Sequence, residues 1–163
     1  TVSPSMDIQI SSNFERLLFE LYGRDGCRVA DTMSRFRNNG SFTVDKNIWN
    51  KACEIFNGES YTDAETMDLI KTHYKVTGML IDPHTAVGLA AGRACRKDNS
   101  SPIITLATAH PAKFPTAVKA ATNIQPKLPT DMANLFDCNE RINLRKNDVA
   151  MVKSFIEDRA NHH

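Results

Sequence analysis

The sequence lacks any long apolar run, because none of its 163 residues lies in a stretch approaching the roughly 18 apolar residues that a membrane span needs. It also lacks a basic-then-apolar leader at its start. Neither sign of charge is in excess: 20 Lys and Arg side chains are matched by 19 Asp and Glu, for a net charge of +1. The composition therefore indicates a soluble protein without an electrostatic preference for nucleic acid or anionic membranes.

Cysteine is sparse and widely spaced. The four cysteines, Cys27, Cys53, Cys95 and Cys138, form no C-x-x-C pair, so neither a zinc site nor a redox motif is indicated. Free thiols are typical of a reducing compartment, and we expect a cytoplasmic protein. Repeats and low-complexity linkers are absent from the sequence as well.

What the sequence contains is helical periodicity over most of its length. Residues 12–78 are predicted to be mainly helical, in four helices that end near Gly23, Asn39-Gly40, Asn57-Gly58 and Gly78, the second and third at left-handed stops. Thr62 and Glu65 predict a capping box at the start of the fourth helix. Residues 80–122 are predicted to form helix, strand and helix. Residues 128–160 are predicted to form C-terminal helices, the first a short one that follows Pro129 and runs through Leu135, with a short extended stretch at 139–144. The expected fold class is α/β, rich in helices and with few strands.

The sharpest local signal is the sequence DPHTAVG at residues 82–88. Asp82 is a favoured N-cap, and Pro83 fits the first helical position, where its missing N–H costs nothing. We therefore expect a helix to begin here, with His84 on the surface of its first turn. Small apolar side chains follow, which suit close packing on a sheet.

One short loop later comes the run PIITL at residues 102–106. It does not alternate between polar and apolar residues, which predicts a strand buried on both faces. In open α/β sheets, ligands bind beyond the carboxyl ends of the strands, so Thr108, His110 and Lys113 are candidate binding residues. The alternatives are a threonine that closes a strand, a turn histidine bonded to backbone and a solvated lysine.

These motifs carry a resemblance to a known family. The sequences DPHTAVG and TAHPAKFP, preceded by SMDI at residues 5–8 and SNFER at residues 12–16, resemble the C-terminal part of threonine synthases from about Ser3 to near Ile156. The resemblance implies a pyridoxal-phosphate enzyme of the tryptophan-synthase β type, called fold type II. The Schiff-base lysine and glycine-rich phosphate cup of such enzymes lie in the N-terminal half, and neither is found here. We therefore expect residues 1–163 to be a C-terminal fragment, a partial domain that is inactive alone.

The resemblance also implies an activity for the intact parent, a lyase of threonine biosynthesis that converts O-phosphohomoserine and water to threonine and phosphate. It places the hydroxyl of Thr108 at the ring nitrogen of pyridoxal phosphate, and His110 and Lys113 at the substrate. Asp82 would lie near the cofactor pocket. No catalytic residue or metal ligand is assigned within this chain, and the cofactor would not be covalently bound to it.

The expected partners are the missing N-terminal half and a small-molecule substrate, not nucleic acid or membrane. An exposed sheet edge beside residues 102–108 would also favour self-association of the fragment. Two other readings stay open: another fold-type II lyase or synthase, and a helical interaction module without chemistry. A cofactor lysine and a glycine-rich loop in the upstream sequence would discriminate between them.

Overall fold

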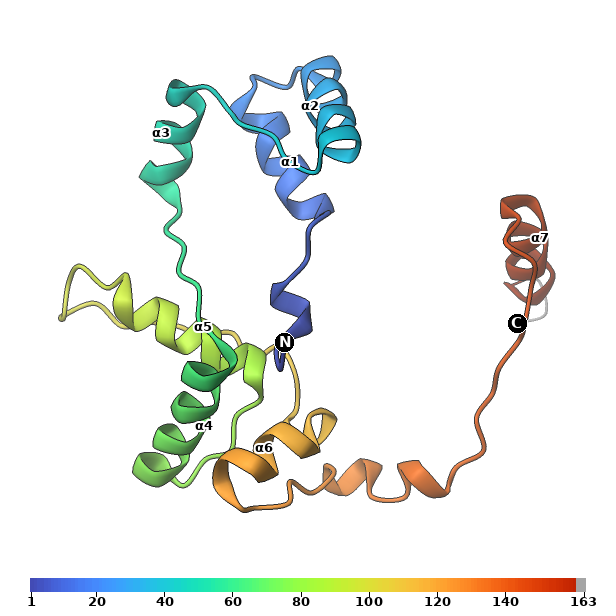
Figure 1. The fold of residues 1–163 in the computed structure, drawn as a ribbon. Helices are drawn as coiled ribbons and strands as arrows, with labels where there is room; N and C mark the ends of the chain where they lie inside the picture. Colours follow the sequence, from blue (N-terminus) through green and yellow to red (C-terminus); the bar gives the residue numbers. More distant parts are fainter. Residues whose placement is uncertain (161–163) are drawn as a thin grey trace. The chain divides into compact units, whose positions relative to one another are not determined.

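The computed structural model describes residues 1–160 of the chain, which divides into two compact units, Thr1–Lys127 and a second one from Leu128 onward. Among the described residues there are helices and turns but no β-strand (Figure 1). The helices are α1 (Ser12–Leu21), α2 (Gly26–Asn39), α3 (Lys46–Ile55), α4 (Asp63–Thr77), α5 (Pro83–Ala94), α6 (Pro115–Thr122) and α7 (Val149–Ala160). The helix-rich part of the prediction is confirmed, and the expected strands are not formed.

Helices α1, α2 and α3 form the first part of the larger unit. Leu18, Tyr22, Met33 and Ile48 make its small hydrophobic core. Helix α2 ends at Gly40, whose φ of 73° is the left-handed conformation that glycine adopts without strain. Helix α3 instead ends in extended backbone at Phe56, so the predicted left-handed stop at Asn57-Gly58 is wrong.

Helix α4 packs against α5 and α6 in the second part of this unit. Its start is the predicted capping box, in which the Thr62 hydroxyl accepts from the Glu65 N–H and the Glu65 carboxylate accepts from the Thr62 N–H. A separate core of Ile70, Ile81 and Ala86 holds these helices together. Residues 12–78 thus supply four helices to two cores rather than to one.

Residues 102–108 are extended but form no strand. Ile104 is 84% exposed and Leu106 is 75% exposed, so the expectation of a strand buried on both faces is wrong for this structure. The physical reason is that a strand needs a neighbour for its N–H and C=O groups, and no described residue pairs with this segment. One side of the segment does lie on α5, where the side chains of Ile103 and Thr105 approach Gly92 and Gly88.

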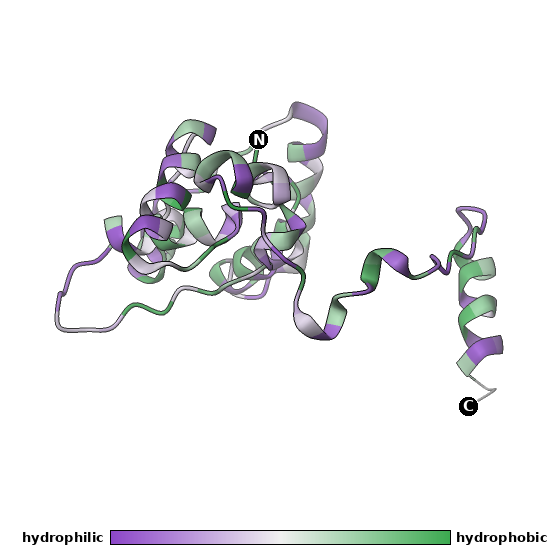
Figure 2. Ribbon diagram, turned by 90° about the horizontal axis from the view of Figure 1, so that it is seen from below, coloured by the Kyte–Doolittle hydropathy of each residue, from purple (hydrophilic) through white to green (hydrophobic). Residues whose placement is uncertain are grey.

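The second unit contains two single 3-10 turns, η3 (Thr130–Met132) and η4 (Leu135–Asp137), followed by α7. The predicted short helix after Pro129 is therefore two separate turns, and residues 139–144 form no strand. None of the described residues of this unit is buried. Much of α7 is hydrophobic, as the green part of this helix in Figure 2 shows. No helix within residues 1–160 has both the length and the apolar character to cross a membrane.

Candidate functional site

The site is organised by the N-terminus of α5. The carboxylate of Asp82 is fully buried and accepts hydrogen bonds from the N–H groups of His84 (2.9 Å) and Thr85 (3.2 Å). The hydroxyl of Thr85 donates to the same carboxylate. These bonds satisfy two backbone donors that a helix start leaves without partners. The predicted helix start at Asp82-Pro83 is confirmed, and the cap fixes the backbone direction of the residues that follow.

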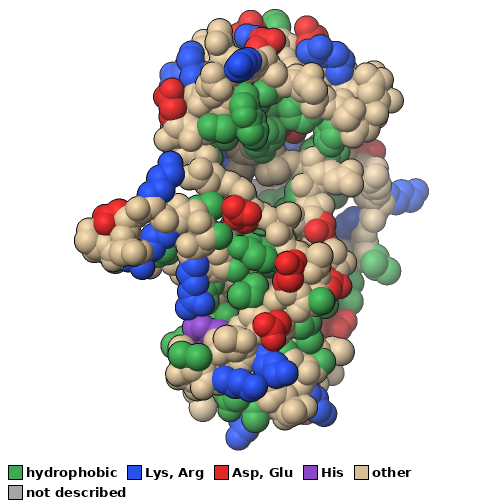
Figure 3. All heavy atoms as spheres, turned by 60° about the vertical axis from the view of Figure 1, so that its left-hand side comes forward, with side chains coloured by type: hydrophobic (Ala, Val, Ile, Leu, Met, Phe, Trp, Pro, Cys, Tyr) green, Lys and Arg blue, Asp and Glu red, His purple; other side chains and the backbone are tan. Residues whose placement is uncertain are grey.

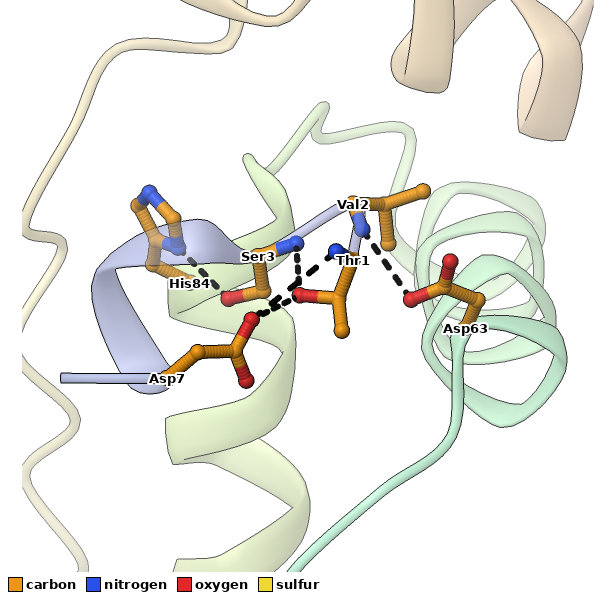
Figure 4. Close-up of polar contacts among 6 residues, drawn as sticks. All are labelled: Thr1, Val2, Ser3, Asp7, Asp63 and His84. Carbon is orange, nitrogen blue, oxygen red and sulfur yellow. Dashed lines mark hydrogen bonds and ion pairs between the residues drawn. The ribbon is translucent and has the colours of Figure 1, made fainter. Parts of the chain in front are cut away.

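His84 does not lie on the surface, and the prediction for it is wrong. Its side chain is only 5% exposed, and Nδ1 lies 2.5 Å from the hydroxyl oxygen of Ser3 (Figure 4). The edge of its ring meets the ring of Phe114, with 4.7 Å between the ring centroids. The first turn of α5 is buried because the N-terminal residues and Phe114 cover it.

The turn η2 (Pro111–Lys113) follows the extended segment and carries two of the predicted site residues. Nδ1 of His110 accepts from the N–H of Ala112 at 3.2 Å, so this side chain makes the backbone contact expected of a turn histidine. A neutral imidazole that accepts through Nδ1 carries its hydrogen on Nε2. His110 is exposed and therefore still offers one donor to a ligand.

Thr108 and Lys113 are also exposed. Lys113 lines a surface groove of about 440 Å³ together with Val2, Met67 and Phe114. The structure thus places all three predicted residues on one continuous segment around η2, with Lys113 at the edge of a groove beside α4. It leaves Thr108 at the end of the extended segment.

Sequence reasoning missed Ser3 and Phe114 as neighbours of His84. Ser3 is buried, and 81 positions separate it from His84. Such a contact leaves no periodicity or cap signal in the sequence. Phe114 is visible only as part of the TAHPAKFP motif, and nothing in that motif shows which helix its ring meets.

A second histidine, His73 on α4, lies outside this cluster. Both of its ring nitrogens are shielded from solvent and have no hydrogen-bond partner among residues 1–160. Burial lowers the pKa of His73 below its usual value of 6.5, and the nearby Arg93 guanidinium lowers it further. These surroundings therefore disfavour the protonated, charged form of the His73 side chain.

Two adjoining apolar grooves, of about 390 and 560 Å³, lie between α1 and α3. Phe14, Trp49 and Ala52 line both of them, and Figure 3 shows hydrophobic side chains gathered in a hollow at the top of the view. Their walls are mostly apolar, like those of the groove beside Lys113, but they contain no histidine and no charged side chain. The chemistry-bearing residues therefore gather at α5 and η2.

Comparison with known proteins agrees with the motifs at this site. Residues 85–156 match the family model described as threonine synthase, C-terminal. A threonine synthase of Pseudomonas aeruginosa is 44% identical over 99% of this chain and 34% of its own length. A threonine synthase of Saccharomyces cerevisiae is 38% identical over 97% of this chain and 35% of its own length. The crystal structure of PLP-bound threonine synthase from Brucella melitensis matches with a TM-score of 0.80 and 40% identity, over 97% of this chain and 34% of that one. The chain spans about a third of the length of the curated relatives it matches, and its sequence and structure are similar to part of threonine synthases.

Proposed function

We propose that this chain is the C-terminal part of a threonine synthase, a pyridoxal-phosphate-dependent lyase that converts O-phosphohomoserine and water to threonine and phosphate. The observation that carries the proposal is the match over nearly the whole chain, at 44% identity in sequence and with a TM-score of 0.80 in structure. No comparable observation favours a different fold-type II lyase or a helical interaction module.

The proposal includes the fold of the intact enzyme. Residues 102–108 pair with a strand from the preceding part of the enzyme and complete a fold-type II sheet. Their extended backbone, their apolar side chains and the exposure of Ile104 and Leu106 support this role. Helix α5 covers one side of the segment, which leaves the other side and the backbone edge for the partner.

The residues around η2 fit the chemistry of the cofactor and substrate. When bound, pyridoxal phosphate supplies an electron sink for negative charge on the substrate. The hydroxyl of Thr108 is exposed, and it would donate to the ring nitrogen of the bound cofactor. Lys113 contributes a point charge to the substrate phosphate, and Nε2 of His110 donates to the substrate. All three side chains are accessible at one end of the extended segment.

A chimeric enzyme tests the function with this chain itself. The C-terminal third of the Pseudomonas aeruginosa enzyme is replaced by residues 1–163, and formation of threonine and phosphate from O-phosphohomoserine is measured. We expect the chimera to make both products in equal amounts. The matched controls are the truncated host enzyme without the third, and the chimera carrying Lys113→Gln. A folded chimera that binds cofactor but makes no threonine would refute the proposal.

A further inference from the structure

His84 connects three parts of the larger unit through one buried side chain. Its backbone is held in the first turn of α5 by the carboxylate of Asp82, which accepts its N–H at 2.9 Å. Because this cap fixes the direction of the His84 Cα–Cβ bond, it also determines the direction in which the imidazole points. The ring then contacts Ser3 on one side and Phe114 on another.

The contact with Ser3 holds the N-terminal segment. Ser3 begins the turn η1 (Pro4–Met6), and its carbonyl accepts from the N–H of Met6 at 2.9 Å. The N–H of Val2 donates to the carboxylate of Asp63 at 3.0 Å, at the start of α4 (Figure 4). The N-terminal segment is thus fixed between α4 and α5, and the His84–Ser3 bond is its buried attachment.

The contact with Phe114 reaches the candidate substrate turn. Phe114 directly follows Lys113, and its N–H closes η2 by donating to the carbonyl of Pro111 at 3.0 Å. The Phe114 carbonyl accepts from the N–H of Val118, which is fully buried in α6. Phe114 is therefore the residue through which η2 joins the helical core. The ring of His84 is packed directly against that residue.

The groove beside Lys113 depends on both contacts. Its walls include Val2 from the N-terminal segment and Phe114 from the end of η2. His84 lies behind both walls, since it bonds the neighbour of Val2 and packs on Phe114. A buried leucine or phenylalanine could fill the same volume, but neither carries a polar atom that can bond the Ser3 hydroxyl.

We infer that His84 is a positioning residue for the substrate phosphate, which it serves by fixing Phe114 and the N-terminal segment so that the Lys113 ammonium is held at its groove. His84 itself touches neither substrate nor cofactor. The inference rests on the proposed function and deepens it, because it names the buried contact that sets the geometry of the phosphate-binding side of the site.

The test uses the active chimera and separates substrate affinity from turnover. Ser3→Ala removes the bond to Nδ1 and leaves the ring contact, whereas His84→Phe keeps a ring and removes the bond. We expect each variant to raise KM for O-phosphohomoserine about 5- to 30-fold, with kcat changed less than about 3-fold. Inhibition by inorganic phosphate should weaken by a similar factor, since phosphate probes the same contact.

The control is Ile70→Val, which alters the fully buried core of α4, α5 and α6 without a polar contact. It should lower thermal stability while leaving KM and phosphate inhibition unchanged. His84→Asn, which keeps a polar atom near the position of Nδ1, should recover part of the affinity. If Ser3→Ala leaves both KM and phosphate inhibition at the wild-type values, His84 has only a packing role and the inference is wrong. Failure of the wild-type chimera to make threonine would instead overturn the proposed function.

Discussion

Replacement of Asp82 by alanine should destabilise the chain more than any change at an exposed cap. The buried carboxylate accepts from two backbone N–H groups and one hydroxyl, and alanine would leave all three donors without a partner. Loss of an N-cap alone costs about 1 kcal/mol, and a hydrogen bond to a charged group contributes about 1.5–3 kcal/mol. Because the three donors share one group and relax together, we expect a loss of about 3–5 kcal/mol in the free energy of unfolding.

The measurement is urea unfolding of the purified chain, followed by far-ultraviolet circular dichroism. With a slope of about 2 kcal/mol per molar urea, Asp82→Ala should lower the midpoint by about 2 M. Asp82→Asn keeps an acceptor for the backbone donors and places its amide opposite the Thr85 hydroxyl, which can accept, so it should cost only about 1 kcal/mol.

Thr62→Ala is the matched control, since it removes an exposed capping residue and should cost about 1 kcal/mol. An Asp82→Ala variant that loses no more stability than Thr62→Ala would show that burial of the cap contributes nothing. Equal losses for Asp82→Ala and Asp82→Asn would show that the hydrogen bonds are not the source of the stability.

Four further outcomes are expected. Thr108→Val in the chimera removes a donor at almost constant volume and should lower turnover about 10- to 1000-fold, while Thr108→Ser retains much of it; equal turnover for the valine variant would remove Thr108 from the site. The pKa of His73 in the folded chain lies below 6.5, so the imidazole is protonated at a higher pH in the unfolded chain than in the folded one. The free energy of unfolding should therefore fall as the pH decreases from about 6.5 towards the folded pKa. His73→Leu should flatten that part of a pH series of urea midpoints, and an unchanged slope would contradict the lowered pKa of His73. The purified chain, incubated with pyridoxal phosphate and freed of excess, should hold no borohydride-reducible bond to a single lysine, which its visible spectrum and peptide masses would reveal. The exposed edge of residues 102–108 should make the chain self-associate as its concentration rises, and light scattering that stays monomeric would count against this.

The helices were predictable where their signals are local. Two helix starts are each predicted by residues of a single turn, Thr62 with Glu65 and Asp82 with Pro83. The structure forms both starts as the sequence predicts. A cap needs only the next turn of its own chain to be satisfied. The Asn57-Gly58 stop is also a local signal, but α3 ends before it, in extended backbone at Phe56.

Features that depend on distant partners could not be predicted in the same way. The apolar run at residues 102–106 has the composition of a buried strand, but strand formation also requires a neighbouring strand, and none is formed in the described part of the chain. His84 stands in the exposed-looking first turn of a helix, and its burial is decided by Ser3, 81 positions earlier. Thr108, His110 and Lys113 were located through a motif, and their roles remain proposals that the chimera tests.

The glycines on the inner face of α5 set a practical limit on how this region can be engineered. Replacing a glycine inside a helix by alanine ordinarily stabilises it by about 0.5–1 kcal/mol. At Gly88 the added carbon would meet the Thr105 methyl at 3.7 Å, an ordinary contact, so that gain is available. At Gly92 it would lie 3.2 Å from the Ile103 methyl and push against the extended segment that ends at Thr108. The same substitution one helical turn apart is thus expected to raise thermal stability at position 88 and to displace residues 102–108 at position 92.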